Sequence, residues 1–268
     1  MNDPLEIRRY GDSGSTVILL HGGPAAPGSM AGLGRELGDE FRVLEPFQRG
    51  AGDEPLTVAR HVADLQGIVE AECAPDRPAL IGSSWGAMLA LAHAAQHPGQ
   101  VSSLVLVGCG TFDPEARKRF QDVFRERSDP ALKQRIARLA EEIEDRSERL
   151  MTMGELIQPL YNFDPKDPDL EVAHCDGRAH HETWSDMLRL QREGVYPAAF
   201  AAIEEPVLML HGSFDPHPGA MIRDSLKPFI PQLEYHEFAE CGHYPWVERA
   251  ARDEFLARLR TWLRSRAS

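Results

Sequence analysis

The stretch Gly82-Ser83-Ser84-Trp85-Gly86 follows the pattern G-x-S-x-G and stands between two segments of different character. Residues 78–81 are predicted to form a strand, and residues 87–97 are predicted to form a helix. In that context the pattern indicates a sharp turn that exposes the serine hydroxyl, with glycine where a Cβ would clash. Only Ser84 has glycine two residues before and two residues after it. We therefore predict that Ser84, and not Ser83, is a nucleophile.

Strand and helix patterns alternate on both sides of this stretch. Apolar runs predict further strands at 5–10, 16–20, 42–46 and 101–107, with a turn at 11–14. Helical spacing predicts helices at 29–41 and directly after Thr57, a typical helix N-cap. Such alternation favours a mostly parallel sheet that is covered by helices on both sides.

The alternation stops after residue 110. Residues 111–200 show helical patterns broken by several prolines, and strand patterns return at 206–210 and 233–238, with helices at 218–229 and 252–264. We predict a core domain made of residues 1–110 and 201–268, with residues 111–200 inserted as a helical cap.

A serine nucleophile needs a base, and the base needs an acid that orients it. His243 follows the last predicted strand, in a loop ahead of the C-terminal helix, and is the predicted base. Asp215 comes just past the carboxyl end of an earlier strand and is the predicted acid. Asp113 follows the strand at 101–107 and is the alternative acid. Helix capping is the ordinary role of an aspartate in such loops.

An oxyanion hole would need two backbone N–H groups. The N–H of Trp85, directly after the nucleophile, is one predicted donor. The second is expected from the loop His21-Gly22-Gly23-Pro24, where Gly23 is the predicted donor because Pro24 has no N–H. His21 is expected to have a structural role and not to act as a second base.

With these residues in place, the chain resembles the α/β-hydrolase superfamily over nearly its whole length. Within it, the chain is most similar to the proline iminopeptidase-like group. The motifs that carry this are residues 21–25 (HGGPA), residues 47–50 (FQRG), the Ser84 stretch and the pair Gly242-His243. The resemblance implies the α/β-hydrolase fold with a cap and hydrolysis through an acyl-enzyme, without a cofactor or a metal.

The motifs also differ from the family pattern. Ala25 replaces a glycine, Phe47 replaces an aspartate, and residues 50–54 lack the usual arginine and serine. Iminopeptidases bind the free amine of the substrate through cap glutamates, which this sequence does not match residue by residue. The acids Glu171, Asp176, Glu182 and Asp186 could serve, but solvated helix faces explain them better.

The overall composition excludes several classes of function. The net charge of −13 disfavours nucleic acid as a partner, and no apolar run is long enough to span a membrane. Four widely spaced cysteines and a charged first segment without a signal-peptide pattern favour a cytoplasmic protein with reduced thiols. The cluster around His174, His180 and His181 lacks the spacing of a zinc motif and is interpreted as a polar cap segment.

The sequence therefore predicts a serine hydrolase that cleaves an ester or amide of a small molecule through an acyl-enzyme on Ser84. A proline iminopeptidase-type aminopeptidase, a hydrolase of carbon–carbon bonds and a catalytically silent binding protein of the same fold are the alternatives. The sequence makes no prediction about the oligomeric state.

Overall fold

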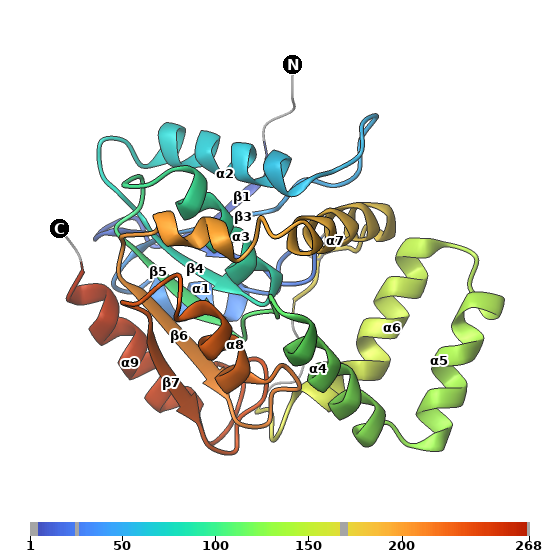
Figure 1. Ribbon diagram of the computed structural model, residues 1–268. Coiled ribbons are helices and arrows are strands. Elements are labelled where there is room, and N and C mark those ends of the chain that lie inside the picture. Colours follow the sequence, from blue (N-terminus) through green and yellow to red (C-terminus); the bar gives the residue numbers. More distant parts are fainter. Residues whose placement is uncertain (1–4, 25–26, 167–170, 267–268) are drawn as a thin grey trace.

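The computed structural model describes residues 5–24, 27–166 and 171–266. Within these residues, seven strands form one sheet in the order β1-β3-β2-β4-β5-β6-β7 (Figure 1). The strands are β1 (Ile7–Tyr10), β2 (Thr16–Leu20), β3 (Arg42–Pro46), β4 (Ala79–Ser83), β5 (Ser103–Val107), β6 (Val207–Gly212) and β7 (Glu234–Phe238). Only β1 runs antiparallel to its neighbour, and the other pairs are parallel. The predicted mostly parallel sheet is confirmed.

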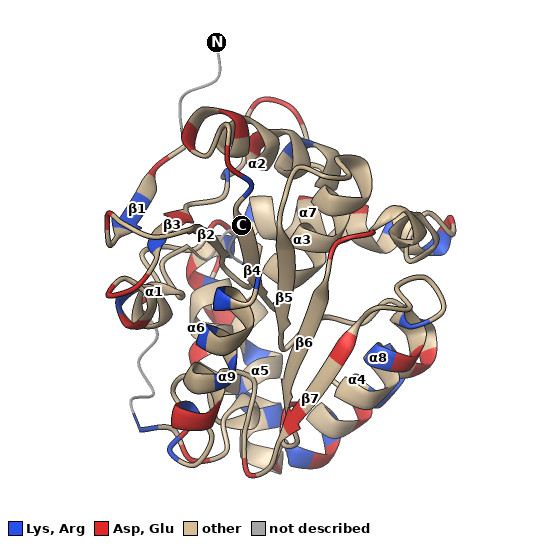
Figure 2. Cartoon of the chain, turned by 90° about the vertical axis from the view of Figure 1, so that its left-hand side faces the viewer, with Lys and Arg blue, Asp and Glu red and all other residues tan. Residues whose placement is uncertain are grey.

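Helices cover both faces of the sheet. They are α1 (Ala31–Leu37), α2 (Val58–Glu72), α3 (Trp85–Gln96), α4 (Pro114–Arg127), α5 (Pro130–Glu142), α6 (Arg146–Tyr161), α7 (Gly177–Arg192), the 3-10 helix η1 (Ala198–Ala202), α8 (Gly219–Leu226) and α9 (Arg252–Arg264). Side chains of α2, α3 and α8 pack into one apolar core with one face of the sheet, and those of α1 and α9 pack into a second core on the other face. The central strands β4, β5 and β6 carry no charged residue and lie between these layers, while Lys, Arg, Asp and Glu lie mainly on the surrounding helices and loops (Figure 2).

Several element boundaries differ from the prediction, and the strand order includes a pairing that the sequence does not predict. α3 begins at Trp85, two residues earlier than predicted, because Ser84 itself occupies the N-cap position. α1 is shorter than the predicted helix at 29–41. β1 and β2 follow each other through a turn but do not pair, because β3 lies between them and pairs with both.

The register of the parallel strands brings their carboxyl ends to one edge. Gly82 of β4 pairs with Leu20 of β2 and Leu106 of β5, and Val107 of β5 pairs with Leu210 of β6. The segments that follow β2, β4, β5 and β6 therefore begin side by side. In open parallel sheets this is the edge where active sites form.

Helices α4 to α7 and η1 all lie between β5 and β6 in the chain. α5 and α6 stand away from the sheet (Figure 1). α7 packs against α6 on one side and against α2 on the other. Among the described residues of 111–200, no strand of the sheet occurs. The division of the chain into a core and a cap at residues 111 and 200 stays a prediction.

Candidate active site

Ser84 lies on a strained turn between β4 and α3. Its φ of 53° and ψ of −115° are rare for a residue with a side chain, and its N–H donates to the carbonyl of Val107 at 2.8 Å. A Cβ at Gly82 would lie 2.2 Å from the Gly86 carbonyl oxygen, and a Cβ at Gly86 would lie 2.0 Å from that of Leu20. Both glycines are therefore required by backbone packing, as the motif predicts.

The two adjacent serines differ in accessibility. Ser83 is 1% exposed, and its Oγ is buried without a hydrogen-bond partner among the described residues. Ser84 is partly exposed. Solvent therefore reaches Ser84 but hardly reaches Ser83.

His243 lies in the loop between β7 and α9, buried against the sheet edge. Its Nδ1 lies 2.6 Å from Oδ2 of Asp215, and its backbone N–H donates to the carbonyl of Tyr161 at 2.8 Å. Gly108, directly after β5, has a φ of +54° and faces the imidazole, and a Cβ there would lie 2.7 Å from Nδ1. The ring therefore occupies space that only a glycine at 108 leaves open.

Asp215 follows β6 at the same edge and is fully surrounded by protein. Burial alone would raise the pKa of its carboxyl, but the neighbouring His243, His211 and His217 lower it well below its usual value. Asp215 is therefore ionised and accepts hydrogen bonds only. It follows that His243 donates from Nδ1, which leaves its Nε2 free to accept a proton.

Asp113, the alternative acid, lies elsewhere. It is the N-cap of α4, where its carboxylate accepts the backbone N–H of Ala116 at 2.8 Å. Of the two carboxylates, Asp215 is the one that contacts His243.

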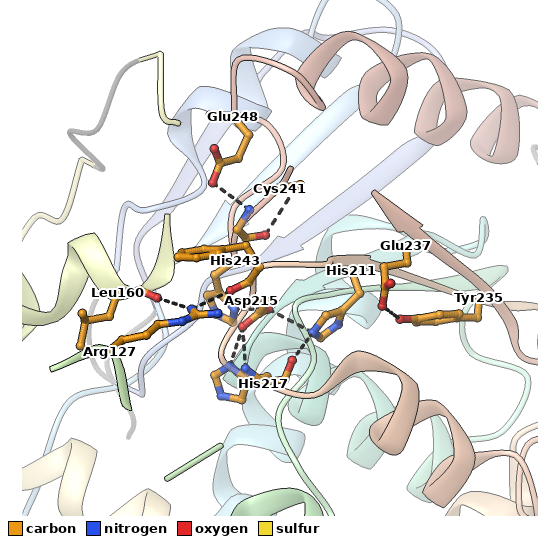
Figure 3. A network of polar contacts seen from close by, with 12 residues as sticks. Arg127, Leu160, His211, Asp215, His217, Tyr235, Glu237, Cys241, His243 and Glu248 are labelled. Atoms are coloured by element: carbon orange, nitrogen blue, oxygen red, sulfur yellow. Dashed lines mark hydrogen bonds and ion pairs between the residues drawn. The ribbon is translucent and has the colours of Figure 1, made fainter. Parts of the chain in front are cut away.

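Two histidines beside Asp215 were missed by the sequence interpretation. His211 on β6 brings Nε2 to 3.1 Å from Oδ2 of Asp215. His217 brings Nδ1 to 3.0 Å from Oδ1, and its backbone N–H donates to the same oxygen at 2.9 Å (Figure 3). The signal was present in the sequence, since both histidines stand within four residues of the predicted acid.

The predicted oxyanion loop lies against the nucleophile. A Cβ at Gly22 would lie 3.1 Å from the Cβ of Ser84. Gly23 follows with a φ of +47°. Trp85 is the first residue of α3, and the N–H groups of a first helical turn have no partner inside the helix. Trp85 thus directly follows Ser84, and Gly23 directly follows the residue that lies against Ser84, while their role as an oxyanion hole stays a prediction.

Gln48 ties these two donor segments together. Its side chain accepts from Nε1 of Trp85 at 2.7 Å and donates to the carbonyl of His21 at 3.0 Å. The backbone N–H of Gln48 donates to Nε2 of His21 at 3.1 Å, and burial lowers the pKa of His21 to about 4. His21 is thus a neutral hydrogen-bond partner, consistent with the structural role expected for it.

The acids of α7 and its N-cap accept hydrogen bonds from the backbone of the core, a role that the sequence does not indicate. Asp176 accepts the backbone N–H of Ala51, Glu182 that of Leu56 and Asp186 that of Val58, at 2.8, 2.8 and 2.9 Å. Asp176, Glu182 and Asp186 thus fasten α7 and its N-cap to the core, whereas Glu171 is exposed and pairs with Arg35 at the surface.

A metal site at His174, His180 and His181 finds no support within the described part of the chain. Among the described residues, the metal-ligand-type side chains that come close together are Asp215, His217 and His243. One ligand atom of each lies within 4.8 Å of the others. Hydrogen bonds of 2.6 and 3.0 Å from the two Nδ1 atoms to the carboxylate account for this spacing.

Residues 15–250 match the alpha/beta hydrolase fold family, and the chain belongs to that family. The chain is 27% identical to a 2-hydroxy-6-oxo-2,4-heptadienoate hydrolase from Pseudomonas putida, over 88% of this chain and 85% of that protein. It is 30% identical to a proline iminopeptidase from Arabidopsis thaliana, over 75% of this chain but only 55% of that protein.

A solved structure with the same fold is that of a thermophilic esterase from Thermogutta terrifontis. It superimposes with a TM-score of 0.66 at 23% identity, over 98% of this chain and 94% of that one. The predicted α/β-hydrolase fold is thereby confirmed, and the chain is a hydrolase by family. No helix in the described part of the chain is long and apolar enough to cross a membrane.

Proposed function

We propose that the protein is a serine hydrolase in which Ser84 attacks a carbonyl carbon of a small-molecule ester or amide. The observation that carries this proposal is the 2.6 Å contact between Asp215 and Nδ1 of His243, at the sheet edge that also bears the strained turn at Ser84. His243 accepts the proton of Ser84 at Nε2 and returns it to the leaving group, and Asp215 holds the imidazole in the required tautomer. The N–H groups of Gly23 and Trp85 stabilise the oxyanion.

The acyl-enzyme on Ser84 is then hydrolysed by water, which His243 activates in the same way. Every group in this scheme belongs to the chain, so no cofactor is proposed.

An ester or a simple amide is the preferred substrate class. The amine of an iminopeptidase substrate would need free carboxylates in the cap, and Asp176, Glu182 and Asp186 are already bound to backbone N–H groups. The 30% identity to a proline iminopeptidase keeps an aminopeptidase as the second candidate. Parallel assays with a short-chain nitrophenyl ester and a proline anilide separate the two, and we expect turnover of the ester.

Replacing the nucleophile tests the proposed role of Ser84. We expect Ser84→Ala to lower kcat for the nitrophenyl ester by about 10⁴-fold or more, because the covalent route is lost. The matched control is Ser83→Ala, which removes the neighbouring hydroxyl and should keep most of the activity. An active Ser84→Ala variant, or equal losses in both variants, would contradict the assignment.

The rate should also depend on pH in the manner of a histidine base. We expect kcat/KM to fall as the pH decreases into the acidic range, since a protonated imidazole cannot accept the proton of Ser84. Circular dichroism at each pH controls for unfolding. An unchanged rate at pH 5, with the protein folded, would exclude His243 as the base.

A further inference from the structure

Three imidazoles surround the carboxylate of Asp215, although a base–acid pair requires only that of His243. The two additional rings are those of His211 and His217. His243 contacts Oδ2 from the loop after β7, His211 contacts the same oxygen from β6, and His217 contacts Oδ1 from within the Asp215 loop (Figure 3). The carboxylate therefore shares its charge among several donors.

His217 is bound to Asp215 twice. Because the carboxylate accepts only, both the backbone N–H and the Nδ1–H of His217 donate to Oδ1, at 2.9 and 3.0 Å. Burial lowers the pKa of His217, in spite of the opposing effect of Asp215, so the ring is neutral at pH 7. A neutral ring that donates from Nδ1 carries its lone pair on Nε2.

The ring of His217 is also fixed by stacking. It lies between the ring of Phe120, with centroids 4.4 Å apart, and that of His243, with centroids 4.9 Å apart. The interplanar angles are 29° and 24°. The two stacks fix the plane of the ring, whose side chain is only 12% exposed, and the hydrogen bond to Oδ1 fixes which edge of the ring faces Asp215.

We propose that His217 is a positioning residue that holds Asp215 for His243 and moderates the charge with which Asp215 acts on the base. This inference rests on the proposed hydrolase function. His217 acts through Asp215 and through its stack on His243, and takes no part in bond making or breaking.

The direction of its effect follows from two contributions of the same sign. Hydrogen bonds to Oδ1 draw charge from the carboxylate, so that it stabilises the imidazolium form of His243 less. The imidazole of His217 also lies 4.9 Å from that of His243, and at acidic pH a proton on one ring disfavours a proton on the other. Removing the His217 ring should therefore make His243 easier to protonate and move the acid limb of the pH profile to higher pH.

Apart from His211, whose pKa is raised by Asp215 in spite of burial, the tyrosines, thiols and arginine around Asp215 do not change charge in the same range. Apart from the three histidines, the ionisable groups that face the cluster from α4, α6, β7 and the loops after β5 and β7 are Arg127, Tyr161, Tyr235, Glu237, Cys109, Cys241 and Tyr244. Burial raises the pKa of these tyrosines and thiols, which keeps them neutral below pH 8, and Arg127 stays charged. Glu237 acts on His211, and both are present in every variant compared below.

Two substitutions separate hydrogen bonding from packing. His217→Phe keeps an aromatic ring between Phe120 and His243 but removes the Nδ1–H donor. His217→Asn loses the stack but places an amide N–H close to the position of Nδ1. The backbone N–H to Oδ1 is retained in both variants.

The test is the rate at which a fluorophosphonate inactivates the full chain between pH 5 and 8, in buffer containing a chelator. We expect His217→Phe to move the midpoint of the acid limb up by about half to one pH unit, which slows inactivation by about 3- to 10-fold at pH values well below the midpoint. In His217→Asn the midpoint should return most of the way to that of the wild type. Unfolding curves verify that each variant is folded.

The outcomes distinguish a failure of the role inferred for His217 from a failure of the proposed hydrolase function. A wild-type protein that is not labelled at Ser84 contradicts the proposed function itself. A labelled wild type whose acid limb is unchanged in His217→Phe, with His217→Asn the more impaired variant, shows that His217 only packs and overturns the inference. Should His217→Phe not fold, His217→Leu, which also lacks the donor, must show the same upward shift.

Discussion

Gly108 lies directly against the imidazole of His243, at the point where the chain leaves β5. Two glycines, Gly108 and Gly110, stand close together in this segment. Their actual use is steric: Gly108 leaves room for the ring of His243, and a Cβ at Gly110 would lie 2.5 Å from the sulfur of Met88.

Replacing Gly108 should displace the base. The new Cβ of Gly108→Ala would approach Nδ1 of His243 within 2.7 Å, and we expect kcat/KM to fall about 10²-fold for a displacement on the order of 1 Å. The matched control is Gly99→Ala, because Gly99 also has a positive φ but has no atom within 4 Å of its would-be Cβ. Kinetics of both variants on the same ester measure the difference. Equal activities would show that the contact with His243 has no catalytic consequence.

The candidate site could be predicted only in part from residues alone. Ser84, Asp215 and His243 stand in a characteristic order along the chain, and Asp215 and His243 are in contact in the structure. Gly108 was not predicted because its importance comes from a contact across the sheet edge, whereas His217 stands only two residues from the predicted acid and could have been found there. No local pattern records that a ring from one loop fills the space above a glycine in another.

At the scale of elements, the end of α6 is bound to the loop that carries His243. Glu248 is fully buried, and its carboxylate accepts the backbone N–H groups of Phe163, Asp164 and Gly242 at 2.7, 2.8 and 2.8 Å. On the other side, Arg127 of α4 donates to the carbonyls of Leu160 and Phe214. The side chain of Arg127 and the backbone of the segment after α6 therefore contact the two loops that carry Asp215 and His243.

Neutralising Glu248 should loosen this junction. We expect Glu248→Gln to lower the free energy of unfolding by about 1–3 kcal/mol, because an amide nitrogen cannot accept and a buried N–H loses its partner. For a chain of this size that corresponds to a decrease in Tm of about 2–8 °C. Glu141→Gln on the exposed side of α5 is the control, with an expected change within about 0.5 kcal/mol. Identical melting curves for the two variants would refute the structural role of Glu248.

The helices and strands could be predicted from the sequence more completely than the strand pairing and the long-range hydrogen bonds. β3 and α9 have the predicted bounds, and Thr57 caps α2 through a hydrogen bond to Arg60. Apolar periodicity identifies such elements because it records burial. It does not record which strands pair, so the position of β3 between β1 and β2 was not predicted. Long-range anchors such as those of Asp176 and Asp186 leave no periodic signal either.

At the scale of the whole molecule, several buried histidines link stability to pH. Burial lowers the pKa of His21, His61 and His93 to about 4 each. In the unfolded chain a histidine has a pKa of about 6.5, so between about pH 6.5 and 4 the unfolded state binds more protons than the folded state. The stability these neutral rings contribute is therefore complete above about pH 6.5 and is lost progressively as the pH falls toward 4.

We accordingly expect the Tm to decrease from pH 7 to pH 5, in a series of thermal unfolding curves at constant ionic strength. His61→Gln should make this decrease shallower, because one of the linked protons is removed. A Tm that is constant or rises over this range would contradict the assignment of these rings as buried and neutral.

The central claim is that Ser84 is the nucleophile of a serine hydrolase, and the most direct test is to locate a fluorophosphonate adduct by mass spectrometry of the digested protein. We predict one adduct per chain, on Ser84, with no adduct in Ser84→Ala and slower formation in a His243→Ala variant. An adduct on Ser83 or on any other residue, or no adduct on the folded protein, would contradict the claim.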